Sequence, residues 1–275
     1  MAPPPWLWKL LLRLTSNDRA QELLWRGMDL SLNLMGIGPG AFVVSSGEGT
    51  LLHELQQGYA RSASPLCIFD VGAHRGTFLE GVIQPLVRLG IPFAAHAFEP
   101  SPKSFADLER AFGNRPNFTL NNCALGSQAG EAELHAPAAG SSLSSFSKRR
   151  LDHFGLDFDH TEKVAVRTLD EYCAERSIAA VDLLKLDVEG HELKVMQGGL
   201  RMFREGRIRM MTFEFGGGNI DSRTYFQDYW YFIHDHHIGD IHRMTPTGHL
   251  VPVSEYKEIY EQFRPTVFVV MQSRT

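Results

Sequence analysis

Four acidic residues stand where short apolar runs end, and they have the strongest claim to chemistry in this chain. They are Asp70, Glu99, Asp187 and Glu214. A carboxylate in such a place can accept hydrogen bonds from sugar hydroxyls, take up a proton or bind a cation. If the apolar runs are parallel strands, their carboxyl ends meet at one edge of a sheet. We therefore expect the four acids to share one site.

The segment 70–76, Asp-Val-Gly-Ala-His-Arg-Gly, has the composition of a ligand-binding turn. Gly72 permits a tight turn and close approach of a ligand, and Gly76 lets a following helix begin close to the strand. Exposed N–H groups at the start of that helix favour a carboxylate or a phosphate. His74 stands where the dinucleotide fingerprint has its middle glycine, which disfavours a pyrophosphate.

Glu99 follows the second apolar run, and Pro100 after it ends the strand. A carboxylate there is placed to accept hydrogen bonds from both ribose hydroxyls of a nucleoside. An acid in the first turn of a helix is the alternative interpretation. The combination with the glycine turn at 70–76 favours ligand binding.

The segment 187–192 holds the densest set of reactive side chains. Asp187 ends an apolar run and is expected close to the reacting group, while Glu189 or His191 could take a proton from a hydroxyl. An acidic helix N-terminus would explain the later acids but not Asp187. Glu214 lies between apolar neighbours, where desolvation would raise its pKa unless it is paired.

From residue 65 onward, short apolar runs alternate with helical patterns. The runs predict strands at 66–71, 93–98, 118–124, 181–186 and 208–215, and the helical patterns fall at 76–90, 101–113, 169–178 and 190–204. This alternation predicts an α/β fold with a doubly wound, mostly parallel sheet. Two later runs, at 238–244 and 266–271, predict an antiparallel C-terminal edge strand. We expect a mobile loop at 136–147, and Pro85 to kink or end the first helix.

Residues 1–60 are predicted to form an N-terminal helical extension, with helices over 17–35 and near 51–55. The apolar segment 6–14 is too short to span a bilayer. Its Trp and Leu residues beside Lys9 and Arg13 would suit a helix lying on a membrane surface. Packing on the chain's own domain or on a second copy, as a homodimer, is the simpler alternative.

Composition excludes several classes of protein. The chain has 275 residues, 43% of them apolar, and 27 basic against 32 acidic residues, a net charge of −5. This balance argues against disorder and against nucleic acid as the main partner. The three widely spaced cysteines indicate core residues in a reducing compartment, so we expect a cytoplasmic protein. The histidines at 234–237 are interpreted as a solvated helix end rather than a metal site.

Taken in order, the motifs resemble the FkbM-type methyltransferases. They are Asp-Val-Gly-Ala-x-x-Gly at 70–76, Phe-Glu-Pro-x-Pro at 98–102, Ala-Leu-Gly at 124–126, Thr-Leu-Asp at 168–170 and Lys-x-Asp-Val-Glu-Gly-His-Glu at 185–192. The resemblance extends over about residues 45–272. It implies a class I, Rossmann-like domain at 61–275 that binds S-adenosylmethionine, in a family whose members often O-methylate sugars or secondary metabolites.

The resemblance also implies roles for residues by position. Asp70, Gly72 and Gly76 would hold the methionine part of the cofactor, Glu99 would bind the ribose, and Asn122 would lie at the adenine.

His74 belongs to the same implied cofactor site, although the family usually has asparagine there. Its imidazole can still donate a hydrogen bond, but its charge would vary near neutral pH. Asp187 and Glu214 would face the methyl group being transferred, and Asp187 would also border the cofactor.

The implied reaction is an in-line methyl transfer to a hydroxyl, with help from a general base. The sequence leaves that base open among Asp187, Glu189, His191 and Glu214. We predict no metal site; were the enzyme dependent on Mg²⁺, Asp187 and Glu214 would be the ligands.

The expected partner is a small-molecule or glycan acceptor. Two alternatives stay open: an NAD(P)-dependent oxidoreductase built on the same sheet, and a cofactor-binding module without catalysis.

Overall fold

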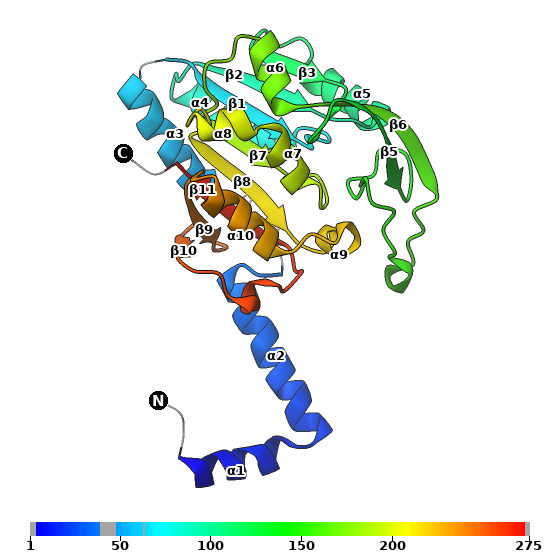
Figure 1. Cartoon of the computed structure of the whole chain (residues 1–275), viewed down its shortest axis with the longest axis vertical. Coiled ribbons are helices and arrows are strands. Elements are labelled where there is room, and N and C mark those ends of the chain that lie inside the picture. The colour runs from blue at the N-terminus through cyan, green and yellow to red at the C-terminus, as the bar shows by residue number, and fades with distance from the viewer. Residues whose placement is uncertain (1–3, 39–47, 63, 273–275) are drawn as a thin grey trace.

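The central sheet has eight strands in the order β10-β9-β11-β8-β7-β1-β2-β3. The computed structural model describes residues 4–38, 48–62 and 64–272 (Figure 1). The strands are β1 (Leu66–Val71), β2 (Phe93–Phe98), β3 (Phe118–Asn121), β7 (Leu183–Leu186), β8 (Met210–Phe215), β9 (Asp240–Met244), β10 (Leu250–Pro252) and β11 (Thr266–Met271). From β3 to β8 all pairings are parallel, whereas β11 is antiparallel to both β8 and β9. The predicted α/β fold with an antiparallel edge is confirmed.

Helices cover both faces of this sheet. They are α3 (Glu48–Ser62), α4 (Thr77–Arg88), α5 (Pro102–Phe112), α6 (Leu169–Glu175), α7 (Glu192–Gly198), α8 (Leu200–Arg204), α9 (Gly218–Ser222) and α10 (Phe226–Asp235). Alternate residues of β1 point to opposite sides: Phe69 enters the core cluster with Tyr172 of α6, and Ile68 enters the cluster with Leu79 of α4. Burial on both faces explains why these strands read as continuous apolar runs.

Two helix predictions need correction. The helix α4 does not end at Pro85 but continues to Arg88, because the proline removes only its own N–H donor from the helix. The single helix expected at 190–204 is divided into α7 and α8 at Gly199, where a Cβ atom would crowd the side chain of Leu169.

A second, three-stranded sheet was not predicted. It has the order β4-β6-β5, formed by β4 (Ala124–Leu125), β5 (Gly130–Ala136) and β6 (His160–Arg167). The segment 136–147, expected as a mobile loop, is tied to this sheet instead. His135 and Ser145 exchange two backbone hydrogen bonds of 2.8 and 2.9 Å, and the Ser145 hydroxyl donates to the carbonyl of Glu189 at 2.9 Å. These bonds place the segment over the carboxyl edge of the central sheet.

The N-terminal helices α1 (Pro5–Thr15) and α2 (Asp18–Met35) project away from the sheet (Figure 1). Asn17 caps α2 through its side-chain oxygen, and Gly36 ends the helix in the left-handed conformation. By contrast, α3, grouped with the extension by sequence, buries Leu51 and Leu55 in the core beside α4. Across the described ranges, no helix is both long enough and apolar enough to cross a bilayer.

The three cysteines are free thiols. Cys123 and Cys173 are buried and Cys67 is half-buried, and burial raises the pKa of the Cys173 thiol to about 11. They are core side chains, as predicted.

Candidate active site

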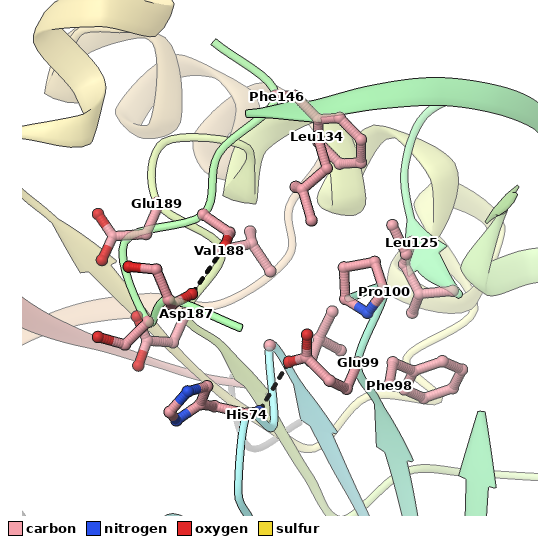
Figure 2. A pocket seen from close by; sticks show the side chains of 16 residues that line it. His74, Phe98, Glu99, Pro100, Leu125, Leu134, Phe146, Asp187, Val188 and Glu189 are labelled. Atoms are coloured by element: carbon pink, nitrogen blue, oxygen red, sulfur yellow. Dashed lines mark hydrogen bonds between the residues drawn. The ribbon is translucent and has the colours of Figure 1, made fainter. Parts of the chain in front are cut away.

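A pocket lies beyond the carboxyl ends of β1, β2 and β7 (Figure 2). Its empty volume is about 540 Å³, including the part open to solvent. Apolar side chains border it: Val71, Phe98, Pro100, Leu125, Leu134 and Phe146. The polar lining includes Gly72, His74, Glu99, Asp187, Glu189 and three serines of the 141–144 segment. Of the four acids predicted to share a site, Glu99 and Asp187 line this pocket, whereas Asp70 and Glu214 do not.

The two predicted glycines are required by contacts within the protein. Gly72 has φ 81°, and a Cβ atom there would overlap the carbonyl oxygen of Asp187. Gly76 has φ 82°, and a Cβ atom there would overlap the ring of Phe112 on α5. Gly72 therefore lets the turn after β1 lie directly against the end of β7, and Gly76 lets α4 start close to α5.

Asp70 lies beneath the turn and does not line the pocket. It pairs with Lys185, a residue to which the motifs assigned no role. Lys185 places Nζ 2.9 Å from Asp70 Oδ1 and 3.4 Å from Asp187 Oδ2. Burial opposes the lysine's charge, but the two carboxylates raise its pKa. Burial raises the pKa of Asp70, against the effect of Lys185, and Asp70 Oδ2 has no hydrogen-bond partner in the described part of the chain. The alternation of Lys185 with Asp187 was the available signal, because residues two apart share a face of a strand.

Glu99 is held rigidly at one side of the pocket. Its Oε2 accepts the N–H of His74 at 2.8 Å and its Oε1 accepts the N–H of Ser101 at 2.9 Å. The side chain is buried, and burial raises its pKa to about 7 despite the two donors. Each oxygen keeps a second acceptor position. The carboxylate can therefore accept hydroxyl donors from a ligand in the pocket.

His74 and Asn122 support Glu99 in different ways. The His74 backbone, at φ 48°, supplies the N–H donor, and its ring Nε2 lies 3.1 Å from the carbonyl oxygen of Gly140. The Asn122 amide donates to the carbonyls of Glu99 and Pro100 at 2.9 and 3.0 Å. Asn122 is exposed and outside the pocket lining, so its contacts in this structure are with the turn that carries Glu99.

Asp187 and Glu189 line the pocket on the side opposite Glu99 (Figure 2). Glu214 lies close by, because Leu186 at the end of β7 pairs with Phe213 of β8, and Asp187 and Glu214 are the residues that follow these two. Burial raises the pKa of Glu214 well above its usual value, and the negative charges of Asp187 and Glu189 raise it further. Glu214 does not itself line the pocket.

Glu189 is paired with Arg149, a second residue that sequence reasoning missed. Arg149 Nη1 lies 2.6 Å from Glu189 Oε2, and its Nε lies 3.4 Å from Asp221. Arg149 is buried, yet desolvation of Glu189 outweighs the attraction and raises the pKa of this carboxyl to about 7. The only sequence signal was a pair of arginines, 149–150, just after the segment 136–147 that was expected to be a mobile loop.

His191 and Glu192 lie beside the pocket rather than in its lining. The ring of His191 packs against Phe146, with centroids 4.5 Å apart, and burial lowers its pKa to about 4. Glu192 accepts the N–H groups of Val188 and Gly190 at 2.9 and 3.3 Å. These bonds fix the turn that presents Asp187 and Glu189. Within the described residues, no group of three or more His, Cys, Asp or Glu side chains is arranged to hold a metal ion.

Comparison with known families shows to which family the chain belongs. Residues 70–238, more than half of the chain, match the family described as the methyltransferase FkbM domain. The chain belongs to the FkbM methyltransferase family. The match starts at the acid of the glycine turn and includes the pocket acids, so the resemblance seen in the motifs is confirmed. The chain carries a methyltransferase domain of this family.

Two curated relatives share part of their length with this FkbM domain. The 31-O-demethyl-FK506 methyltransferase FkbM of Streptomyces tacrolimicus is 31% identical over 155 residues, covering 48% of this chain and 58% of that protein. The 2-O-methyltransferase NoeI of Sinorhizobium fredii (strain NBRC 101917 / NGR234) is 27% identical over 153 residues, covering 51% and 60%. The matched region is thus less than two thirds of either relative.

Solved structures with a related arrangement include two methyltransferases. The plantazolicin methyltransferase BpumL in complex with SAH has a TM-score of 0.39 at 8% identity, covering 95% of this chain and 93% of that one. A TehB-like SAM-dependent methyltransferase from Corynebacterium glutamicum ATCC 13032 has a TM-score of 0.38 at 11% identity, covering 93% and 100%.

The residues present fit the cofactor of this family. A buried acceptor, Glu99, faces a pocket with apolar walls at Phe98 and Leu125, as a nucleoside with a hydroxyl-bearing ribose requires.

Proposed function

We propose that this FkbM-family chain is an O-methyltransferase that acts on a hydroxyl of a sugar, glycan or secondary metabolite. The observation that carries the proposal is the two-sided pocket, with Glu99 held by main-chain donors on one side and Asp187 and Glu189 on the other. The names of the two relatives, a 31-O- and a 2-O-methyltransferase, support an oxygen acceptor.

S-adenosylmethionine would supply a methyl group already attached to a good leaving group. In our proposal Glu99 accepts the ribose hydroxyls, and the main chain at Gly72 and His74 borders the methionine end. Asp70 and Gly76 shape that end from outside the pocket lining, Asp70 by holding Lys185. Asn122 stays a prediction for the adenine contact.

Glu189 is our proposal for the general base. It lines the pocket, its pKa is raised to about 7 by desolvation, and only its Oε2 is occupied by Arg149 in the described part of the chain. A base with a pKa near neutrality combines a usable ionised fraction with real affinity for a proton. Glu189 Oε1 would accept the proton of the acceptor's hydroxyl as the hydroxyl oxygen takes the methyl group. The bond between the methyl carbon and the cofactor's sulfur would break, S-adenosylhomocysteine would leave, and the proton would pass to solvent.

The other candidates receive supporting roles in this proposal. Asp187 is paired with Lys185, whose Nζ lies 3.4 Å from Asp187 Oδ2, and so holds this cation at the pocket. Glu214 lies behind the two lining acids, and burial together with their negative charges raises its pKa well above its usual value. His191 faces Phe146 rather than the pocket.

Calorimetric titration with S-adenosylhomocysteine and with NAD tests the cofactor class. We expect binding of S-adenosylhomocysteine and none of NAD; the reverse result would support the oxidoreductase alternative. Incubation with methyl-labelled cofactor and candidate sugars or metabolites then tests the reaction. Label recovered in a methyl ether supports O-methylation, whereas label on nitrogen or carbon contradicts it. A binding module without catalysis would bind the cofactor and label no acceptor.

We also propose that turnover needs no metal ion. Asp187 and Glu214 are the residues that a Mg²⁺ ion would use, but Lys185 already places a cation beside Asp187. Treatment with a chelator should leave turnover unchanged. A loss restored by Mg²⁺ and not by other salts would contradict this.

A further inference from the structure

The first helix of the chain leaves nearly all of its apolar side chains in solvent. No residue of α1 is buried. Its exposed large side chains are Trp6, Trp8, Leu10, Leu11, Leu12 and Leu14. Figure 1 shows α1 lying crosswise at the far end of α2, away from the sheet. An apolar surface of this kind on a protein marks a binding site.

The helix α2, which carries α1, is attached at its C-terminal end to the domain that contains the central sheet, here called the body. Leu32 and Ile37 are buried, and Arg264 of the body lies 2.6 Å from Asp29 of α2. At the other end the Gln21 side chain donates to the carbonyl of Thr15 at 2.8 Å, which links the two helices. The body therefore anchors α2 and does not cover α1.

The charges of α1 indicate what covers it. Between Pro5 and Thr15 the charged residues are Lys9 and Arg13, and there is no acid, although the whole chain carries a net charge of −5. Residues four apart lie about 40° from each other around a helix, so both cations share one narrow side. The rest of the circumference is apolar, with two tryptophans. Trp rings and basic side chains beside an apolar helix surface are typical of helices that lie in a lipid headgroup region.

We propose that α1 binds the surface of a bilayer that contains anionic lipid. The apolar side chains enter the boundary between headgroups and acyl chains, while Lys9 and Arg13 extend to the lipid phosphates. Leu24, Trp25 and Met28 of α2 are exposed as well. Eleven residues span only about 16 Å, so the helix lies on the bilayer and does not cross it.

A second copy of the chain is a poorer partner for α1. Pairing two copies of this helix would bring four cations together with no acid on either helix. Such a contact gains apolar burial but suffers repulsion between like charges, whereas anionic headgroups neutralise both cations.

Sedimentation of the full chain with vesicles tests the proposal. We expect binding to vesicles of phosphatidylglycerol with phosphatidylcholine, and much weaker binding to phosphatidylcholine alone. The double variant Lys9→Gln, Arg13→Gln should bind the anionic vesicles roughly 30-fold more weakly, at about 1 kcal/mol for each basic residue. Trp6→Ser with Trp8→Ser should also weaken binding. Ile259→Ser, at an exposed apolar residue of the body, is the matched control and should bind as the original chain does.

Three results would overturn the proposal. One is no binding to either vesicle. Another is equal binding to both vesicles, unaffected by the Lys9 and Arg13 substitutions. The third is a dimer in light scattering that Trp8→Ser dissociates, together with no binding to vesicles, which would assign α1 to a second copy. Because α1 contributes nothing to the core, the variants should keep the melting temperature of the original chain. A vesicle result also leaves the methyltransferase proposal untouched, since the cofactor pocket is in the body.

Discussion

Glu99 is buried and Glu189 is half-buried on the pocket wall, and desolvation raises both pKa values to about 7, yet their surroundings differ. Both oxygens of Glu99 accept backbone N–H groups, so its position is fixed by the fold. Glu189 is held through one oxygen by the side chain of Arg149. The backbone N–H groups around Glu99 make it a fixed hydrogen-bond acceptor for a ligand. The ion pair with Arg149 leaves one oxygen of Glu189 able to take up a proton. The difference separates a cofactor side from a reaction side in one pocket.

A substitution at Gly72, where the turn after β1 meets the end of β7, has the largest expected effect on stability. Gly72→Ala places a methyl group against the Asp187 carbonyl oxygen at a left-handed φ, so the turn after β1 must move away from β7. We expect a loss of roughly 3 kcal/mol or more in the free energy of unfolding. Urea denaturation measures it. Gly90→Ala is the control: it has φ 67° but open space around the new Cβ, so it should lose only about 1 kcal/mol. Equal losses would show that the contact with Asp187 is unimportant.

Replacing Glu189, the proposed general base, should lower turnover without changing cofactor affinity. Glu189→Gln keeps the shape and the contact with Arg149 but cannot accept a proton, so turnover should fall about 100-fold or more. Affinity for S-adenosylhomocysteine should stay near that of the original chain. Steady-state kinetics with labelled cofactor provides the comparison, with Glu175→Gln on the exposed surface as control. Unchanged turnover would move the base role to another acid of the cluster.

Replacing Glu99 should weaken cofactor binding with little effect on turnover. In Glu99→Gln the new amide group opposes one of the two N–H donors and removes the charge, so S-adenosylhomocysteine should bind roughly 10- to 100-fold more weakly. Turnover at saturating cofactor should fall much less. A large fall in turnover without a change in affinity would contradict the assignment of Glu99 to the ribose.

The pH profile sharpens the comparison further. Glu189 must be ionised to accept a proton and its pKa is raised to about 7, so turnover should rise with pH below 7 and level off above it. Arg149→Gln removes the cation that lowers this pKa, so the rising limb should shift to higher pH by about one unit. The same raised pKa means that the folded chain holds this proton more tightly than the unfolded chain does. The contribution of Glu189 to the free energy of unfolding therefore falls as pH rises from about 4.5 to about 7.

The parallel strands were predictable from sequence and the second sheet was not. The predicted runs at 66–71, 93–98 and 266–271 coincide with β1, β2 and β11, because strands buried on both faces need unbroken apolar residues. The strand β5 has mostly exposed or half-buried residues and forms against β6 more than twenty residues later in the chain. Such pairing depends on tertiary contacts that local composition does not report.

The site shows the same division. Acids at strand ends, such as Glu99 and Asp187, could be found because a parallel sheet brings its carboxyl ends together. Their partners could not: Arg149 meets Glu189 across 40 residues and Lys185 meets Asp70 across 115. His191 was grouped with the candidate bases because it is close in sequence to Asp187, but the turn at Gly190, with φ 94°, places its ring against Phe146.

Calorimetric titration of S-adenosylhomocysteine into the original chain, Glu99→Gln and Glu189→Gln tests the two-sided pocket most directly. We expect binding by the original chain, a roughly 10- to 100-fold loss of affinity for Glu99→Gln and near-original affinity for Glu189→Gln. Equal losses in both variants, or no binding by the original chain, would contradict a pocket divided into a cofactor side and a reaction side.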